Sequence, residues 1–125
     1  MLKGQVVDLA AVEYEDRAIQ HFKLYKNASN YHVNTETWVN SISIDDGWGK
    51  EIVVQFGTEW DHKGVFATDS NGMNMVERKW DYRPTWDLNV TNEPTACNFF
   101  PVNSAITLAD AEDGKKRLTV VNDRA

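Results

Sequence analysis

The chain has 125 residues and a mass of 14.3 kDa, enough for one globular domain and too little for two well-packed ones. Its formal net charge of −6 repels phosphate backbones, so nucleic acid is disfavoured as a partner. Its apolar residues form no unbroken stretch near the roughly 18 that a membrane helix requires. We therefore expect one domain over residues 1–125, with neither nucleic acid nor a membrane as its partner.

The N-terminal residues carry no readable export signal. Lys3 precedes an apolar run, but this run is interrupted by Asp8 and is soon followed by Glu13, Glu15 and Asp16. A signal peptide does not tolerate acids in its apolar region. We therefore expect no signal peptide in this chain.

The stretch "VEYEDRAIQHF" at residues 12–22 fits a helical and a strand pattern about equally well. Val12 and Tyr14 are residue types that favour strands, and the overlapping "QHFKLY" at residues 20–25 alternates in polarity. We interpret this region as strand.

Further along the chain, polarity alternates with the period of two that is typical of strands with one buried face. Ile52, Val54 and Phe56 alternate in one such run, and Trp86 alternates with Leu88 in another, which assigns Trp86 to the core. The runs predicted as strands are residues 32–39, 51–56, 85–91, 104–110 and 117–123.

Turn-forming residues separate these runs. They lie in "DDGWG" at residues 45–49, "DSNG" at 69–72 and "AEDG" at 111–114. Asn71-Gly72 is a strong hairpin signal because both residue types tolerate the positive φ of a type I′ turn. Short alternating strands with turns between them predict an all-β fold.

No pattern of metal ligands is recognisable. The three histidines have no partner at helical or short-loop spacing, and the acids before Gly114 lack the residue order of an EF-hand loop. We therefore expect a solvated turn before Gly114 and no metal bound by this chain. The residues considered are His21, His32, His62, Asp110, Glu112 and Asp113.

The sequence also lacks a recognisable catalytic motif. It has no Gly-rich phosphate loop, and no Ser or Cys lies in a nucleophile elbow. A glycosidase pair requires two carboxyl groups about 5–10 Å apart, which a sequence cannot show. The one cysteine, Cys97, cannot form an intrachain disulfide, and we expect it to be buried and inert. We expect no autonomous catalysis and no catalytic residue in this chain.

Two N-glycosylation sequons are present, beginning at Asn27 and at Asn89. In the predicted strand 85–91, Asn89 lies on the face opposite Trp86 and Leu88, where a glycan could project. Asn89 is therefore the stronger candidate acceptor, and Asn27 the weaker one.

With these residues identified, the chain resembles the lysosomal type of α-mannosidase in glycoside hydrolase family 38. Five motifs occur in the family's order and near its spacing, and they cover residues 40 to 124 strongly and residues 1 to 39 only loosely. Asn92, an extra residue, and Cys97, in place of a small one, are modest departures. The motifs are "IDDGWGKEIVVQF", "TDSNG", "ERKWDYRPTWDLNVTNEP", "NFFPVNS" and "RLTVVNDR".

The resemblance implies an incomplete portion of the family's C-terminal antiparallel β-sandwich, a galactose-mutarotase-like supersandwich. It implies a parent enzyme that is a zinc-dependent retaining exo-α-mannosidase acting on terminal mannose of glycoprotein N-glycans in the lysosome or secretory pathway. In the family, the nucleophile and the zinc ligands belong to an N-terminal catalytic domain, which would be this chain's partner. No catalytic or metal residue is carried over to this chain, and "NVT" at Asn89 coincides with a family sequon.

A second hypothesis is a free-standing carbohydrate-binding module, because indole rings stack on sugar faces. Trp48, Trp60, Trp80 and Trp86 make this conceivable, whereas the simpler interpretation is packing in a core or between domains. Two or more coplanar exposed indoles in one concavity would favour binding. On the first hypothesis, we expect exposed apolar surface where other domains of the parent dock.

Overall fold

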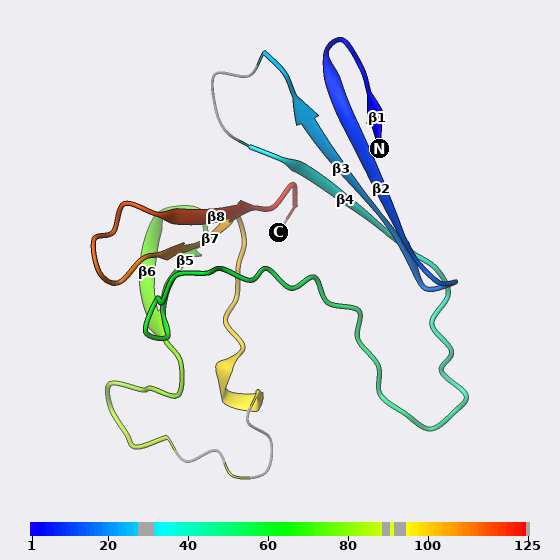
Figure 1. The fold of residues 1–125 in the computed structure, drawn as a ribbon. Coiled ribbons are helices and arrows are strands. Elements are labelled where there is room, and N and C mark those ends of the chain that lie inside the picture. Colours follow the sequence, from blue (N-terminus) through cyan, green and yellow to red (C-terminus); the bar gives the residue numbers. More distant parts are fainter. Residues whose placement is uncertain (28–31, 89–90, 92–94, 125) are drawn as a thin grey trace. The chain divides into compact units, whose positions relative to one another are not determined.

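The computed structural model describes residues 1–27, 32–88, 91 and 95–124. Within these residues the structure has two antiparallel sheets, one short 3-10 helix η1 (Ala96–Asn98) and no α-helix (Figure 1). The all-β antiparallel prediction is therefore confirmed, as expected for part of a β-sandwich. No helix in this part of the chain has the length and apolar character needed to cross a membrane.

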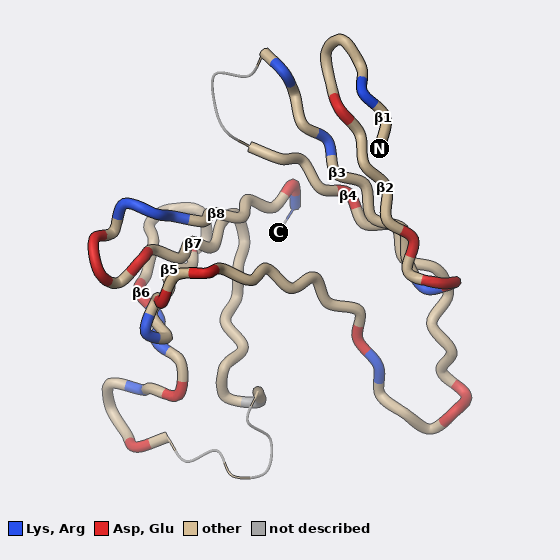
Figure 2. The backbone as a smooth tube through the Cα atoms, viewed as in Figure 1, with Lys and Arg blue, Asp and Glu red and all other residues tan. Residues whose placement is uncertain are grey.

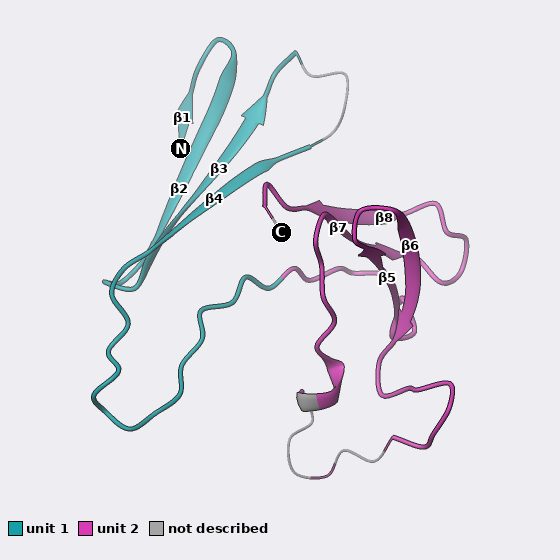
Figure 3. Cartoon of the chain, turned by 180° about the vertical axis from the view of Figure 1, so that it is seen from behind, with its two compact units in different colours: residues 1–55 teal, residues 56–125 magenta. Residues whose placement is uncertain are grey.

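The chain forms two compact units, Met1–Gln55 and Phe56–Ala125 (Figure 3). Each unit contains one four-stranded sheet. The expectation of a single domain over residues 1–125 stays a prediction.

The sheet of the first unit follows chain order, β1-β2-β3-β4. The longest pairing joins β2 to β3 from Val7↔Tyr25 to Tyr14↔Ala18, across a tight turn in which Glu15 has a φ of 50°. Residues 12–22 are therefore a β-hairpin, and the strand interpretation is confirmed. The strands are β1 (Leu2–Lys3), β2 (Val7–Tyr14), β3 (Ala18–Tyr25) and β4 (Asn34–Val39).

Little of this first sheet is buried. Ala18 is the one buried hydrophobic residue in the described part of the chain, and Gln20 beside it is 6% exposed. β4 confirms the strand predicted over 32–39, but it is exposed on both faces, so the expected half-burial is wrong. The reason is that, among the described elements, only the neighbouring strand β3 contacts β4 and none covers its faces.

The second sheet has the order β6-β5-β7-β8. β5 and β6 are joined through Asn71 and Gly72, whose φ values of 52° and 72° confirm the predicted hairpin turn. β7 and β8 confirm the strands predicted over 104–110 and 117–123, with ends shifted by one or two residues. The strands are β5 (Val65–Ser70), β6 (Asn74–Lys79), β7 (Ala105–Ala109) and β8 (Arg117–Val121).

One face of the second sheet is apolar. Ile106 pairs with Val120 and Leu108 pairs with Leu118, and all four side chains are half-buried. Phe56 joins them in lining a pocket of about 150 Å³. The alternation in the sequence therefore predicted the buried face correctly.

Two of the predicted strands are wrong. Residues 51–56 form no strand, and residues 84–86 form a turn and a bend, with no strand up to residue 88. Trp86 is 56% exposed and does not lie in a core. Alternation shows which face of a strand would be buried, but a strand also requires a neighbour for its backbone groups, and neither segment has one in the described part of the chain.

Candidate functional site

Three of the sequence motifs meet in the second unit. The end of β5 and the loops after β5, after β6 and before β7 contribute side chains that contact one another's backbones and side chains. We call this set of residues the motif cluster. It comprises Asp69, Asn71, Arg78, Asp81, Arg83, Asn98, Phe100 and Asn103.

Asp69, near the end of β5, is the hub of the motif cluster and is only 4% exposed. Its Oδ1 accepts hydrogen bonds from the backbone N–H groups of Asn103, Ser104 and Ala105 at 2.9, 2.8 and 3.1 Å. Its Oδ2 accepts one from the backbone N–H of Gly72 at 2.8 Å. The bond from Ser104, with those from the other three N–H groups, holds the pKa of Asp69 well below its ordinary value of 3.8, although burial opposes the shift.

Asp69 thereby joins the β5–β6 turn to the start of β7. The two strands β5 and β7 pair at only two positions, Ala67↔Thr107 and Thr68↔Ile106. A further bond from Asn103 Nδ2 to Asn71 Oδ1, 2.9 Å long, fixes the same loop. The carboxylate therefore extends a short junction between segments that are more than thirty residues apart in sequence.

Two arginines lie close to the ring of Phe100. The guanidinium carbons of Arg78 and Arg83 lie 5.5 and 5.2 Å from the centre of its ring, distances at which a cation is attracted to an aromatic face. Phe66 packs edge-on against the same ring, with the ring centres 5.2 Å apart. Arg78 Nε also donates to Thr68 Oγ1 at 3.2 Å, which orients this guanidinium.

The loop after β6 is held by its own polar contacts. Asp81 has a φ of 49°, and its backbone N–H donates to Asn98 Oδ1 at 3.0 Å, while Asn98 Nδ2 donates back to Asp81 Oδ1 at 2.8 Å. Arg83 donates to the carbonyl oxygens of Tyr82 and Cys97. Asp69 and Arg83 therefore bind backbone groups, whereas Arg78 and the Asp81 carboxylate contact side chains. None of these contacts pairs a nucleophile with a base.

The predicted glycosylation sites are only partly described. Asn27 is exposed in the turn that follows β3. Asn89 lies outside the described residues. Neither acceptor is therefore tested by the structure, and both remain predictions.

Several other candidates differ from expectation in detail. Cys97 is half-buried, whereas full burial was expected. In the turn before Gly114, Asp110 is 9% exposed and its Oδ1 accepts the Glu112 N–H at 3.0 Å. Both signs of charge occur along the β7–β8 loop, in which Glu112 and Asp113 are solvent-exposed (Figure 2). The prediction of a solvated turn is thus correct except at Asp110, which is buried because it caps the turn.

No cluster of metal ligands exists among the described residues: no three of their His, Cys, Asp or Glu side chains gather in one place. His62 Nδ1 and Trp60 Nε1 are buried and have no hydrogen-bond partner in the described part of the chain. These two atoms belong to ring systems near the start of β5 and do not form a ligand set.

The exposed indoles lie on separate elements. Trp38 is on β4, Trp48 follows the turn at residues 45–47, Trp80 follows β6 and Trp86 lies in the bend beyond Pro84. Neither of the two pockets in the sheets is lined by an indole. This arrangement does not favour sugar stacking.

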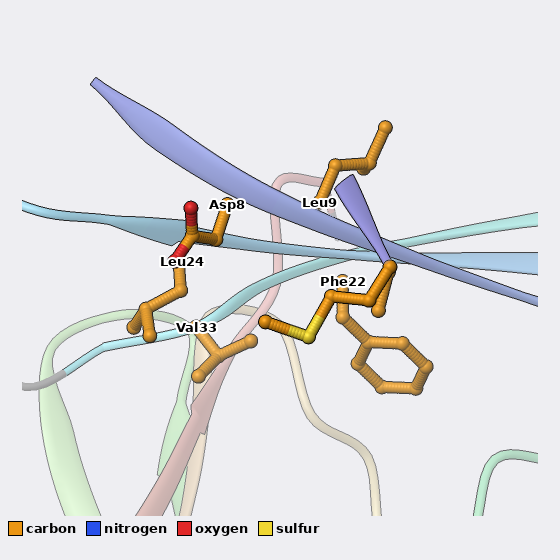
Figure 4. A pocket seen from close by; sticks show the side chains of 7 residues that line it. Asp8, Leu9, Phe22, Leu24 and Val33 are labelled. Carbon is orange, nitrogen blue, oxygen red and sulfur yellow. The ribbon is translucent and has the colours of Figure 1, made fainter. Parts of the chain in front are cut away.

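The pocket of the first unit has a volume of about 170 Å³ (Figure 4). Aliphatic and aromatic side chains make up most of its wall, and Asp8 is its one charged residue. Asp8 is paired with Lys26 at 3.1 Å, so its charge is already compensated. The lining residues are Met1, Asp8, Leu9, Ala10, Phe22, Leu24 and Val33.

Comparison with known protein families shows which family the motifs belong to. The family model described as "Glycosyl hydrolases family 38 C-terminal domain" matches residues 1–125. The chain belongs to this family. The match includes residues 1–39, so the family extends over the N-terminal part that the motifs covered only loosely.

Relatives of this family 38 C-terminal domain are α-mannosidases. The protein named lysosomal alpha-mannosidase from cattle (Bos taurus) is 48% identical over 125 residues, which is all of this chain and 12% of the relative. The human (Homo sapiens) protein of that name is 48% identical over 94 residues, 75% of this chain and 9% of the relative. A probable alpha-mannosidase from Arabidopsis thaliana is 38% identical over 125 residues, again 12% of its length. The chain therefore spans about a tenth of the relatives it matches.

The role of Asp69 was missed from the sequence, where this residue was considered only as the first of the turn-forming stretch "DSNG" at residues 69–72. A usable signal was present, because an aspartate shortly before Asn-Gly commonly accepts hydrogen bonds from the turn's own N–H groups. The three bonds from residues 103–105 had no such signal, since they join segments distant in sequence.

Proposed function

We propose that this domain is the supporting, non-catalytic β portion of a zinc-dependent retaining exo-α-mannosidase that removes terminal α-mannose from glycoprotein N-glycans. The observation that carries the proposal is the 48% identity over all 125 residues to a much longer lysosomal alpha-mannosidase. The motif cluster agrees with a supporting role, because its charged groups contact backbone and side chains of their own unit.

In this proposal the rest of the parent polypeptide supplies the chemistry. A retaining glycosidase uses two carboxyl groups about 5–5.5 Å apart, one of which is the nucleophile. Zinc polarises substrate oxygens and stabilises developing charge. The described residues of this chain do not fit a zinc site, since no three potential ligands gather among them. The partner of this domain is therefore the parent's catalytic domain, which would bind the mannose-containing oligosaccharides.

The proposal places the parent in the lysosome or the secretory pathway, with Asn89 and Asn27 as glycan acceptors. The support is that several relatives are named lysosomal, together with the exposure of Asn27. Treating the secreted parent with an endoglycosidase should lower its mass. Asn89→Gln and Asn27→Gln should each remove one glycan, and an unchanged mass in either variant would reject that acceptor.

The activity is tested by comparing the parent with the 125-residue chain on an aryl α-mannoside. We expect the parent to hydrolyse it, to lose activity on chelation and to regain activity with zinc, whereas the chain alone should be inactive. NMR of the first-formed sugar should show retention of the anomeric configuration. Hydrolysis by the chain at rates near the parent's, or a parent that is inactive with zinc, would contradict the proposal.

Saturable binding of mannose oligosaccharides to the chain alone would favour the carbohydrate-binding alternative.

A further inference from the structure

Residues 40–55, which we call the arm, connect β4 to the end of the first unit without forming a strand (Figure 1). The arm displays large apolar side chains to solvent: Ile44, Trp48 and Val53 are 83%, 77% and 74% exposed. Surface of this kind commonly marks an interaction site.

The tip of the arm is ordered by its own contacts. Asp46 Oδ1 accepts the backbone N–H of Trp48 at 3.2 Å, and the Asp46 carboxylate also pairs with Lys50. Lys50 Nζ donates to the carbonyl oxygen of Ser43 at 3.2 Å. The tip is therefore a defined turn that fixes the point at which the next limb, residues 51–55, begins.

The limb 51–55 has the composition of a strand but lacks a neighbour. No backbone group of residues 51–55 forms a hydrogen bond with any residue that the structure describes. Exposure nevertheless alternates as in a strand with one protected face, with 39% at Ile52, 74% at Val53 and 46% at Val54. In water, solvent molecules hydrogen-bond to these backbone groups. A partner that covered the apolar side chains would displace that solvent, so another backbone would have to supply the donors and acceptors in its place.

We propose that residues 51–55 pair as a β-strand with a strand from the remainder of the parent polypeptide, which also covers Ile52 and Val54. The inference rests on the proposed function in that it requires a parent, and the chain spans only 12% of its cattle relative. Addition of a strand satisfies the backbone of the limb, while its side chains fill apolar surface on the partner strand. A second copy of this chain is a poorer occupant, because each copy has a net charge of −6.

The decisive measurement is hydrogen–deuterium exchange of the amides of residues 51–55 in the full-length parent and in the 125-residue chain. Because a paired amide exchanges only when its strand opens, we expect at least about a hundredfold slower exchange in the parent. Equal, fast exchange in both proteins would overturn the proposal. Protection in the chain alone that rises with its concentration would identify a second copy as the occupant and overturn it as well.

Proline substitutions in the parent locate the pairing. Along a strand, successive N–H groups point to opposite edges, so Val53→Pro and Val54→Pro each remove a donor from a different edge. We expect at least one of them to bring the exchange of residues 51–55 to the rate in the isolated chain. Ser41→Pro, in the same arm but outside the limb, is the control and should leave that exchange slow. Equal effects of all three prolines would argue against a paired strand.

These readouts separate the two proposals. Turnover of the aryl α-mannoside tests the parent's activity, and exchange at residues 51–55 tests strand pairing whatever the parent hydrolyses. An active parent with unprotected amides would reject only the pairing. An inactive parent with protected amides would reject only the proposed function.

Discussion

The two units have the same number of strands but connect them in different ways. In the first unit every strand pairs with its neighbour in sequence, and the β2–β3 hairpin pairs along its whole length. In the second unit β5 lies between β6 and β7, and its pairing with the distant β7 covers two positions. Strands that are adjacent in sequence pair at a small entropic cost once the turn between them forms, whereas pairing of distant strands must offset the entropy of closing a long loop.

In the second unit, side-chain contacts help to offset this loss of entropy. Asp69 adds three bonds to the start of β7, and Phe100 adds an aromatic and cationic contact to β5 and β6. The first unit has a part-buried polar chain through Gln20, and its ion pairs of Lys23 with Glu36 and of Lys26 with Asp8 are partly exposed. Side-chain substitutions should therefore damage the second unit more than the first.

Asp69→Asn should cause the largest loss of stability in either unit. An amide side chain presents one acceptor oxygen and an NH2 group, so buried backbone N–H groups would face a donor. We expect a melting temperature several degrees lower, with amide exchange accelerated in β5 and β7 and little changed in β2 and β3. Asp61→Asn is the matched control, because Asp61 is an exposed acid that also accepts a backbone N–H, from Lys63 at 2.7 Å. Equal effects of the two variants would show that Asp69 has no special role.

The same carboxylate should make the stability of the second unit depend on pH in the acid range. Because folding lowers the pKa of Asp69 below 3.8, its contribution to stability is fully present above about pH 4–5 and is lost only as the pH falls below 3.8. Chain unfolding followed from pH 7 to pH 2 should therefore show a decline below about pH 4 that Asp69→Asn reduces. An unchanged pH profile in the variant would contradict this assignment.

The sequence was informative wherever local chemistry decides the structure. Asn71-Gly72 predicted its turn, and the alternation around Leu118 and Val120 predicted the inner face of β8, because turn preference and burial pattern are properties of a few neighbouring residues. The strand preference of Val12 and Tyr14 likewise predicted strand in this region, and the structure shows that it is a hairpin.

The sequence failed wherever a partner decides the structure. Residues 51–56 and Trp86 have the pattern of buried strands, yet both are exposed, because the described part of the chain supplies no neighbour for them. The hydrogen bonds of Asp69 could not be predicted for a related reason. Three of the four N–H groups that donate to its carboxylate belong to residues about 35 positions away in the sequence. A sequence pattern predicts that a side chain favours burial or that a strand needs a neighbour. Only the structure shows which segment provides the burial or the neighbour.

Phe100→Ala should have the next largest effect. It removes a half-buried ring that contacts Phe66 and two guanidinium groups, and we expect a loss of about 1–3 kcal/mol, below the range for fully buried phenylalanines. Urea unfolding of the chain measures this loss. The control is the neighbouring Phe99→Ala, since Phe99 is 72% exposed. A similar loss from both variants would mean that the packing around Phe100 adds nothing specific.

Gln20→Ala should have the smallest effect, although Gln20 is the most buried polar residue of the first unit. Its Oε1 accepts the Tyr14 hydroxyl at 3.3 Å and its Nε2 donates to Thr37 Oγ1 at 3.2 Å, but both partners are exposed enough for water to replace it. We expect a loss of about 1 kcal/mol, since neither partner is left buried and unpaired. Thr35→Ala on the same face of β4 is the control. A loss above that of Phe100→Ala would reverse the comparison, because it would show that the hairpins of the first unit also depend on side-chain contacts across strands.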